Sequence, residues 1–166
     1  MARFDSIYVR NCNSAIKKLS LVFAGDLPEE HRWLAEEMGL SGVIKGLGHL
    51  PHDEVLRLTK SAALLMAMNY EGFSTLIPGK IYEYWAIGGP PILLLSCPGA
   101  ASSLIEKHGI GMSVDPYDVH SIESAIYDAF QKHKAGLPPR ISHRGIERYD
   151  RKFLASQLRD VLQELV

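Results

Sequence analysis

Residues 71–91 read EGFSTLIPGKIYEYWAIGGPP. A polar loop rich in Gly, Ser and Thr leads through Pro78 into a short helix-forming stretch, which a Gly-Gly-Pro-Pro run stops. Glu83 lies about one turn into this predicted helix. An α/β fold can offer a phosphate-sized anion such a helix N-terminus, with a carboxylate one turn further on to hold a ribose. The stretch therefore predicts a ligand site and sets the fold class.

Apolar runs alternate with helix-forming stretches from residue 20 to residue 133. This alternation predicts an α/β fold, a doubly wound, Rossmann-like parallel sheet with helices on both faces. The run 62–68 is apolar throughout, so we expect a central strand there. Residues 1–166 are interpreted as a single domain, of which 134–166 form a C-terminal helical tail. The other strands are expected at 20–24, around 43–44, at 91–95 and at 110–114, and the helices at 28–38, from 51 onward, at 100–108 and at 118–132.

The composition excludes several partners. The chain has a formal net charge of −1, so it lacks the excess of basic residues that binding to nucleic acids or to an anionic membrane would favour. Two distant cysteines, Cys12 and Cys97, are interpreted as reduced thiols in a cytoplasmic protein. The apolar runs are too short to span a bilayer, so no transmembrane segment is expected. Docking at the inner face of the membrane through a partner remains an alternative.

Ligands of parallel α/β sheets bind at the carboxyl ends of the strands. The loops expected there are 25–26, 46–49, 69–77, 96–99 and 115–117. They make Gly25, Asp26, Gly48 and His49 candidate site residues, together with the loop before the 79–87 stretch. A metal site at His49 and His52 is disfavoured, because no Cys or acidic ligand set accompanies the two histidines. We therefore expect no metal at these histidines.

Four motifs resemble a known family when taken in order. They are LVFAGD at 21–26, VIKGLGHL at 43–50, PGKIYEYWAIGGP at 78–90, and GIG followed by VDP between 109 and 116. Together they resemble the C-terminal, nucleotide-sugar-binding domain of retaining GT-B glycosyltransferases of the group 1 type. The third motif is similar to the form found in enzymes of cell-surface polysaccharide assembly.

The resemblance implies roles for individual residues. Glu83 matches the family's glutamate that accepts hydrogen bonds from the ribose hydroxyls; the alternative is a helix-surface glutamate paired with Lys80. The family carries a second glutamate eight positions earlier, where this chain has Thr75, and Glu71 lies four residues before that. Either Glu71 or Thr75 fills that role, or the role is vacant.

A diphosphate is expected beside Glu83. The backbone N–H groups from Ser74 to Gly79, together with the helix dipole, would hold it. Lys80 lies in the first turn, where a cation is unfavourable unless an anion compensates, so it is interpreted as a phosphate contact or as the partner of a glutamate.

The large aromatic side chains are expected to pack in the interior: Trp33, Trp85, Tyr82 and Tyr84. No catalytic residue is assigned.

The resemblance also implies a function. The expected enzyme transfers a hexosyl group from a UDP or GDP sugar to a glycan or lipid-linked acceptor, with retention. Family chains are about twice as long and include an N-terminal acceptor-binding domain, which is not represented in these 166 residues. The chain alone is therefore expected to bind donor without turnover. The alternative is a non-catalytic, regulatory nucleotide-binding α/β domain.

Overall fold

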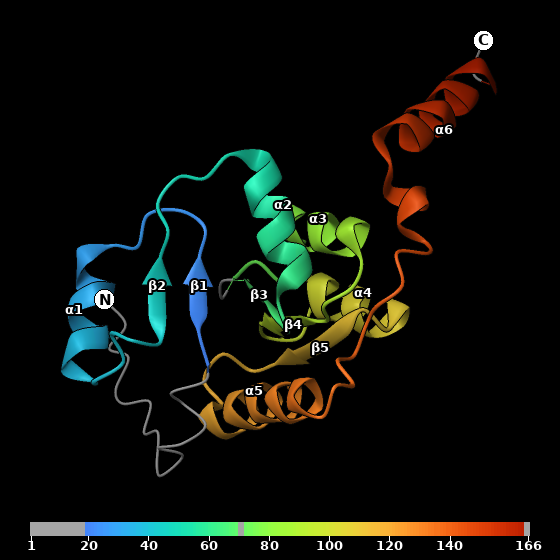
Figure 1. Ribbon diagram of the computed structural model, residues 1–166. Helices are drawn as coiled ribbons and strands as arrows, with labels where there is room; N and C mark the ends of the chain where they lie inside the picture. The colour runs from blue at the N-terminus through green and yellow to red at the C-terminus, as the bar shows by residue number, and fades with distance from the viewer. Residues whose placement is uncertain (1–18, 70–71, 165–166) are drawn as a thin grey trace. The chain divides into compact units, whose positions relative to one another are not determined.

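The computed structural model describes residues 19–69 and 72–164 (Figure 1). The chain divides into two compact units, Met1–Arg57 and Leu58–Val166. Both units hold parallel strands connected by helices, as the alternating sequence pattern predicts. The α/β fold class is therefore confirmed. Glu71 and Cys12 lie outside the described residues.

The first unit is built on two short parallel strands. β1 (Leu21–Phe23) pairs with β2 (Ile44–Gly46), and α1 (Glu29–Glu37) connects them. Two acidic residues occupy the first turn of α1, where the positive end of the helix dipole favours them. Among the described residues of this unit, only Leu27 and Ala35 are buried hydrophobic side chains. Trp33, which the sequence led us to expect inside, is 60% exposed.

The second unit contains a three-stranded parallel sheet in the order β3-β4-β5. α2 (His52–Ser61) leads into this unit across the boundary between the two units. The sheet is followed along the chain by a short 3-10 helix, η2 (Ile146–Tyr149), and by α6 (Arg151–Glu164). The remaining elements are β3 (Leu65–Met68), α3 (Gly79–Ile87), β4 (Ile92–Leu95), α4 (Ala100–His108), β5 (Gly111–Val114) and α5 (Val119–Lys134).

The expectation for the run 62–68 was wrong in two respects. The strand begins only at Leu65, because residues 62–64 form the link from α2. β3 is also not central: β4 lies between β3 and β5 and pairs with both. An uninterrupted apolar run marks burial, but it does not tell which strand has two neighbours.

The core of the second unit lies between the sheet and two helices. Ile92 and Leu94 of β4 pack with Ile81 and Trp85 of α3 and with Ile105 of α4. Side chains alternate along a strand, so Leu93 points to the opposite face, and it too is fully buried. Figure 1 shows α5 on that opposite side, and this helix buries its small residues Ala125 and Ala129. Helices thus cover both faces of this sheet.

Hydrogen bonds and ring contacts attach residues 141–149, which follow α5, to the α3 side of the core. Ile141 exchanges two backbone hydrogen bonds with Gly89, at N···O distances of 2.7 and 3.2 Å. The Trp85 indole donates to the Ser142 carbonyl at 3.1 Å. The Trp85 ring also lies 4.4 Å from the His108 ring and 5.6 Å from the Tyr149 ring, centroid to centroid. One buried tryptophan therefore joins α3, α4 and the 141–149 segment.

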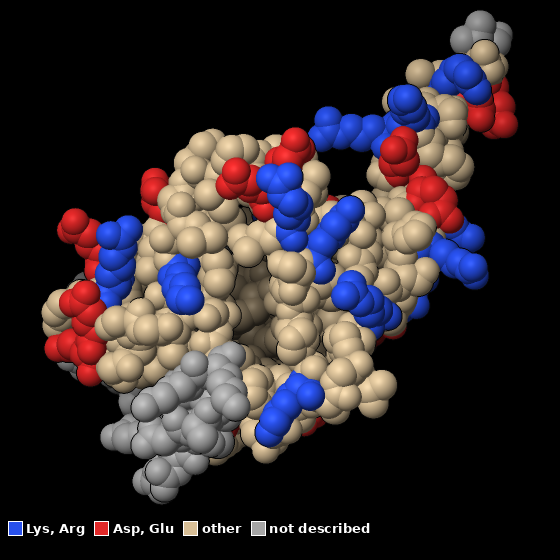
Figure 2. Space-filling view, in the orientation of Figure 1, with Lys and Arg blue, Asp and Glu red and all other residues tan. Residues whose placement is uncertain are grey.

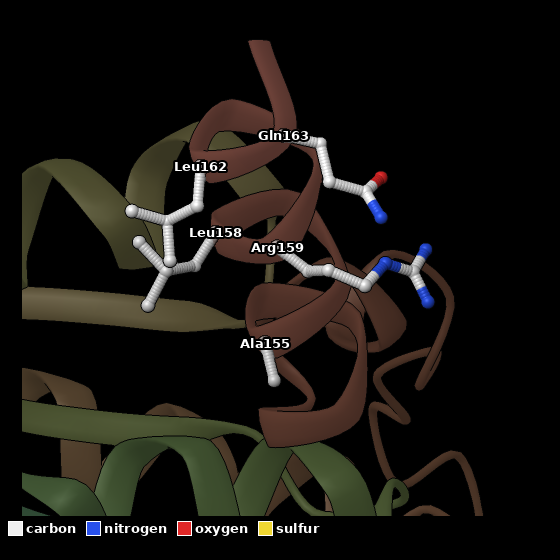
Figure 3. A pocket seen from close by; sticks show the side chains of 5 residues that line it. All are labelled: Ala155, Leu158, Arg159, Leu162 and Gln163. Carbon is white, nitrogen blue, oxygen red and sulfur yellow. The ribbon is translucent and has the colours of Figure 1, made fainter. Parts of the chain in front are cut away.

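α6 contributes no buried residue to the core. Leu154, Leu158 and Leu162 recur every four residues and are each about half exposed. In Figure 3, Leu158 and Leu162 point to one side of the helix, while Arg159 and Gln163 point to the other. These side chains line a hollow of about 560 Å³, which α6 alone forms. The hollow is a helix flank, remote in the chain from the predicted site.

Trp85 should dominate the stability of the second unit. We expect Trp85→Ala to lower the free energy of unfolding by about 3–5 kcal/mol, because it empties a fully buried aromatic position and leaves the Ser142 carbonyl unpaired. Trp33→Ala is the matched control, and should cost less than about 0.5 kcal/mol because Trp33 is largely exposed. Urea unfolding measures both. Similar losses from the two substitutions would contradict this account.

Acid should weaken the packing around His108. Burial lowers the pKa of the His108 imidazole below its ordinary 6.5, and the charges of Lys107 and Arg148 act in the same direction. The unfolded chain therefore takes up this proton at a higher pH than the folded chain, so stability falls as pH drops through 6.5.

The variant His108→Phe tests this pH dependence, because it keeps an aromatic ring and removes the titration. We expect the melting temperature of His108→Phe to depend less steeply on pH between 8 and 5 than that of the parent chain. His133→Phe, at an exposed position of α5, serves as the control. An unchanged slope in His108→Phe would show that other groups carry the acid sensitivity.

Candidate functional site

The β3–α3 loop is anchored at the carboxyl end of the sheet by one buried amide. Asn69 directly follows β3 and is 8% exposed. Its side-chain Nδ2 donates to the Phe73 and Leu76 carbonyls, both at 3.1 Å. Its backbone N–H donates to the Leu95 carbonyl of β4 at 3.0 Å. Asn69 therefore joins the end of β3 to β4 through its backbone, and it fixes the loop that leads to α3 through its side chain.

The same loop is tied to the N-terminus of α4. The Ala100 N–H donates to the Ser74 carbonyl at 2.7 Å. Gly99 makes this approach possible, because a Cβ at that position would overlap the Ser74 backbone. The Gly99 N–H is taken by the Ser102 hydroxyl at 2.9 Å. The N–H groups of Gly99 and Ala100, where α4 begins, are thus used within the protein.

The N-terminus of α3 differs in this respect. Pro78 precedes the helix, and no side chain of the described residues caps it. The Ile81 N–H donates to the Pro78 carbonyl at 3.0 Å, while the Gly79 and Lys80 N–H groups have no acceptor among the described residues. Gly79, Ser74 and Thr75 are exposed. Two amides and the positive end of the α3 dipole are therefore available to an anion.

Glu83 and Lys80 form an ion pair on the exposed side of α3. The Lys80 Nζ lies 2.9 Å from Glu83 Oε2, and the two side chains are 53% and 63% exposed. The hydrogen bond to Glu83 raises the pKa of the Lys80 ammonium, although partial burial opposes it. The pair compensates a cation placed near the positive helix end. Exposed pairs are weak, so Glu83 can exchange this partner for a ligand hydroxyl at little cost.

The remaining predicted residues fall into a second group, in the first unit. Gly25 and Gly48 follow β1 and β2, pair through an isolated bridge and both have positive φ, 140° and 65°. Asp26 and His49 come directly after them and are exposed. The structure thus brings Ser74, Thr75, Gly79, Lys80 and Glu83 together within the second unit, and Gly25, Asp26, Gly48 and His49 together within the first. Glu71 lies outside the described residues.

Charged side chains of both signs lie on the face that Figure 2 shows. Figure 2 shows basic and acidic side chains interspersed on the visible face, consistent with a net charge of −1. Over the described residues, His, Cys, Asp and Glu side chains nowhere gather in a group of three or more suited to a metal ion. Anion binding would therefore depend on local backbone dipoles and Lys80.

The comparison with protein families decides the assignment. Residues 9–148 match the family described as glycosyl transferases group 1. This chain belongs to the group 1 glycosyltransferases. A search of curated proteins returned no match. Family membership supports a role in glycosyl transfer, and therefore a sugar donor as substrate. Among the described residues, no helix combines the length and apolar character needed to cross a membrane.

Sequence reasoning missed two residues that shape this candidate site. Asn69 was placed in the loop without a role, although a lone amide directly after an apolar strand is a usable signal. Gly99 was assigned to the loop after β4, but its contact partner Ser74 lies 25 positions earlier in the chain. No local pattern could have revealed that contact.

A methyl group at position 99 should disturb the loop. We expect Gly99→Ala to displace the Ser74 backbone, break its bond to the Ala100 N–H and lower the free energy of unfolding by about 1–3 kcal/mol. Gly42→Ala is the matched control: nothing lies within 4 Å of its Cβ position, so its stability should change by less than about 1 kcal/mol. Denaturant unfolding and the amide NMR shifts of residues 73–76 report the two effects, and unchanged shifts in Gly99→Ala would contradict the contact.

Proposed function

We propose that this glycosyltransferase chain binds the nucleoside-diphosphate sugar donor at the N-terminus of α3. The observation that carries the proposal is that, over residues 19–69 and 72–164, the Gly79 and Lys80 amides of α3 have no acceptor and lie one turn before an exposed glutamate. A diphosphate matches the amides and the helix dipole. The two hydroxyls of a ribose match the two oxygens of Glu83.

Each residue has a distinct role in this proposal. Lys80 leaves Glu83 and contacts a phosphate oxygen, so its charge compensates the leaving diphosphate. Ser74 and Thr75 lie in the loop that faces the sugar–phosphate part of the donor, with Glu71 or Thr75 as the contact to the sugar. Gly25, Asp26, Gly48 and His49 contribute a second set of donor contacts. The base is uracil or guanine, and no metal or other cofactor takes part.

The proposed reaction moves a hexosyl group with retention. The bond between the anomeric carbon and the diphosphate oxygen breaks, and the nucleoside diphosphate leaves with the electron pair. An acceptor oxygen bonds to that carbon on the same face, and its proton passes to the released diphosphate or to solvent. The acceptor is a glycan or a lipid-linked saccharide of cell-surface polysaccharide synthesis, and the protein works in the cytoplasm, including at the inner membrane face. A separate acceptor-binding domain or subunit would close over the donor and exclude water.

The donor site is tested by thermal denaturation in the presence of UDP, GDP, ADP and the matching hexose nucleotides. One base should raise the melting temperature, because a ligand at about 100 times its dissociation constant stabilises by about 2.7 kcal/mol. Glu83→Ala should abolish most of this shift while changing stability by less than about 1 kcal/mol, since its ion pair is exposed.

Glu106→Ala provides the control for Glu83→Ala. It removes an exposed glutamate of α4, away from the N-terminus of α3, and should keep the full nucleotide shift. Equal loss in both variants would mean a general charge effect. A shift with bare nucleotides that the attached sugar does not improve would favour the regulatory, non-catalytic alternative.

The isolated 166-residue chain should not transfer sugar. We expect no product above background when it is incubated with labelled UDP- or GDP-hexoses and either free glycans or lipid-linked saccharides, because no acceptor-binding half is assigned in these residues. Scintillation counting of the separated products measures this. Transfer at rates typical of enzymes would overturn the proposed division of labour.

A further inference from the structure

Carbonyl groups of the loop before α3 are bonded within the protein. The Phe73 and Leu76 carbonyls each accept a hydrogen bond from the Asn69 side-chain Nδ2, at 3.1 Å. The Leu76 N–H also closes a turn onto the Phe73 carbonyl at 3.0 Å. The Ser74 carbonyl accepts from the Ala100 N–H at 2.7 Å. Three of the loop's acceptors are therefore occupied by donors of the protein itself.

The N–H groups of the same stretch are bonded less. Ser74, Thr75 and Ile77 have N–H groups without an acceptor among the described residues, as do Gly79 and Lys80 at the start of α3. The backbone is thus sorted by polarity, with acceptors bonded inside the protein and donors left for solvent or a ligand. A row of free N–H groups attracts an anion, whereas a carbonyl turned toward that anion would repel it.

Asn69 supplies two of these inward bonds from a single buried amide. The residue is only 8% exposed. Two carbonyl acceptors require the NH2 group of the amide, because a hydroxyl donates only once and a carboxylate does not donate at all. An aspartate of the same shape would place negative oxygens against the Phe73 and Leu76 carbonyls, so at least one of these peptide groups would have to turn. The side chain at position 69 therefore decides which way the loop peptides face.

We propose that Asn69 is a positioning residue for the diphosphate of the donor. It holds the Phe73 and Leu76 carbonyls inside the protein, so that the loop presents N–H groups to the anion. Asn69 acts only through the backbone of the loop and does not touch the ligand. This inference rests on the donor site proposed at α3, and it assigns the loop's preference for an anion to one buried amide outside that site.

Isothermal titration calorimetry on the full 166-residue chain tests this role. The probes are UDP with UMP, GDP with GMP, and inorganic diphosphate. The ratio of the monophosphate to the diphosphate dissociation constant isolates the contribution of the second phosphate. Asn69→Ala should weaken binding of the nucleoside diphosphate and of inorganic diphosphate by about tenfold or more, as expected for a lost hydrogen bond to a charged group. The monophosphate should weaken less, so that the ratio falls toward one.

Asn69→Asp should lower this ratio further, because its carboxylate repels the two carbonyls that the amide holds. Circular dichroism during heating shows whether each variant is folded at the temperature of the titration. If Asn69→Ala and Asn69→Asp do not fold, Asn69→Ser replaces them. It keeps one donor, so its ratio should also fall, by a smaller factor.

Ile110→Val provides the matched control. Ile110 is 1% exposed and directly precedes β5, at the end of the sheet opposite to the loop. The substitution removes a buried methyl group and should lower the melting temperature. Because it leaves the loop backbone in place, the ratio of the two dissociation constants should stay at the value of the parent chain.

Amide NMR locates the effect on the loop. Inorganic diphosphate should shift the Ser74, Thr75 and Ile77 amide signals of the parent chain, because their N–H groups have no acceptor among the described residues. In Asn69→Ala, about tenfold more diphosphate should be needed for the same shifts.

The possible outcomes separate this inference from the donor site itself. Unchanged ratios in folded Asn69 variants, beside clear binding by the parent chain, would overturn the role of Asn69 and leave the donor site intact. A parent chain that binds none of the probes would overturn the donor site and this inference with it. Equal weakening of monophosphate and diphosphate, or the same fall in Ile110→Val, would indicate a general loss of structure and would also overturn the role of Asn69.

Discussion

Burial of β4 on both faces is the constraint on which the second unit depends. Ile92, Leu93 and Leu94 have no solvent exposure, so helices must cover both sides of the strand. The strand also pairs with two neighbours, and Gly111 of β5 lies so close to the Ile92 backbone that a Cβ would overlap it. Each side of β4 thus has a fixed partner, and the ends of β3, β4 and β5 are aligned by their register.

The alignment of these strand ends fixes the geometry of the candidate site. Asn69 is bonded to the end of β4 and reaches the following loop through its side chain. Ser74 is bonded to the start of α4. With both ends of the loop fixed, α3 begins at Gly79 with its first amides exposed, while Ile81 and Trp85 bury the other side of the helix. Packing of the buried side therefore positions the donors on the exposed side.

Local signals predicted much of this fold. The helix expected at 100–108 was confirmed to the residue, because Gly109 ends it in the left-handed conformation that favours glycine. Pro28 and two acidic residues correctly indicated the start of α1. The run 62–68 misled because Ala62, Ala63 and Leu64 are apolar but lie in a connection. Hydrophobicity reports burial, and a link between two packed elements is also partly buried.

The sequence by itself determined the α/β class, the family and the side of α3 on which Lys80 and Glu83 meet. Those properties depend on residues within one or two helical turns, or on short motifs, and so can be recognised locally. Only the tertiary structure decided that β4 lies between β3 and β5, and that the first amide of α4, at Ala100, is used on the Ser74 carbonyl. Those properties depend on hydrogen bonds and contacts between segments that fold together from distant parts of the chain.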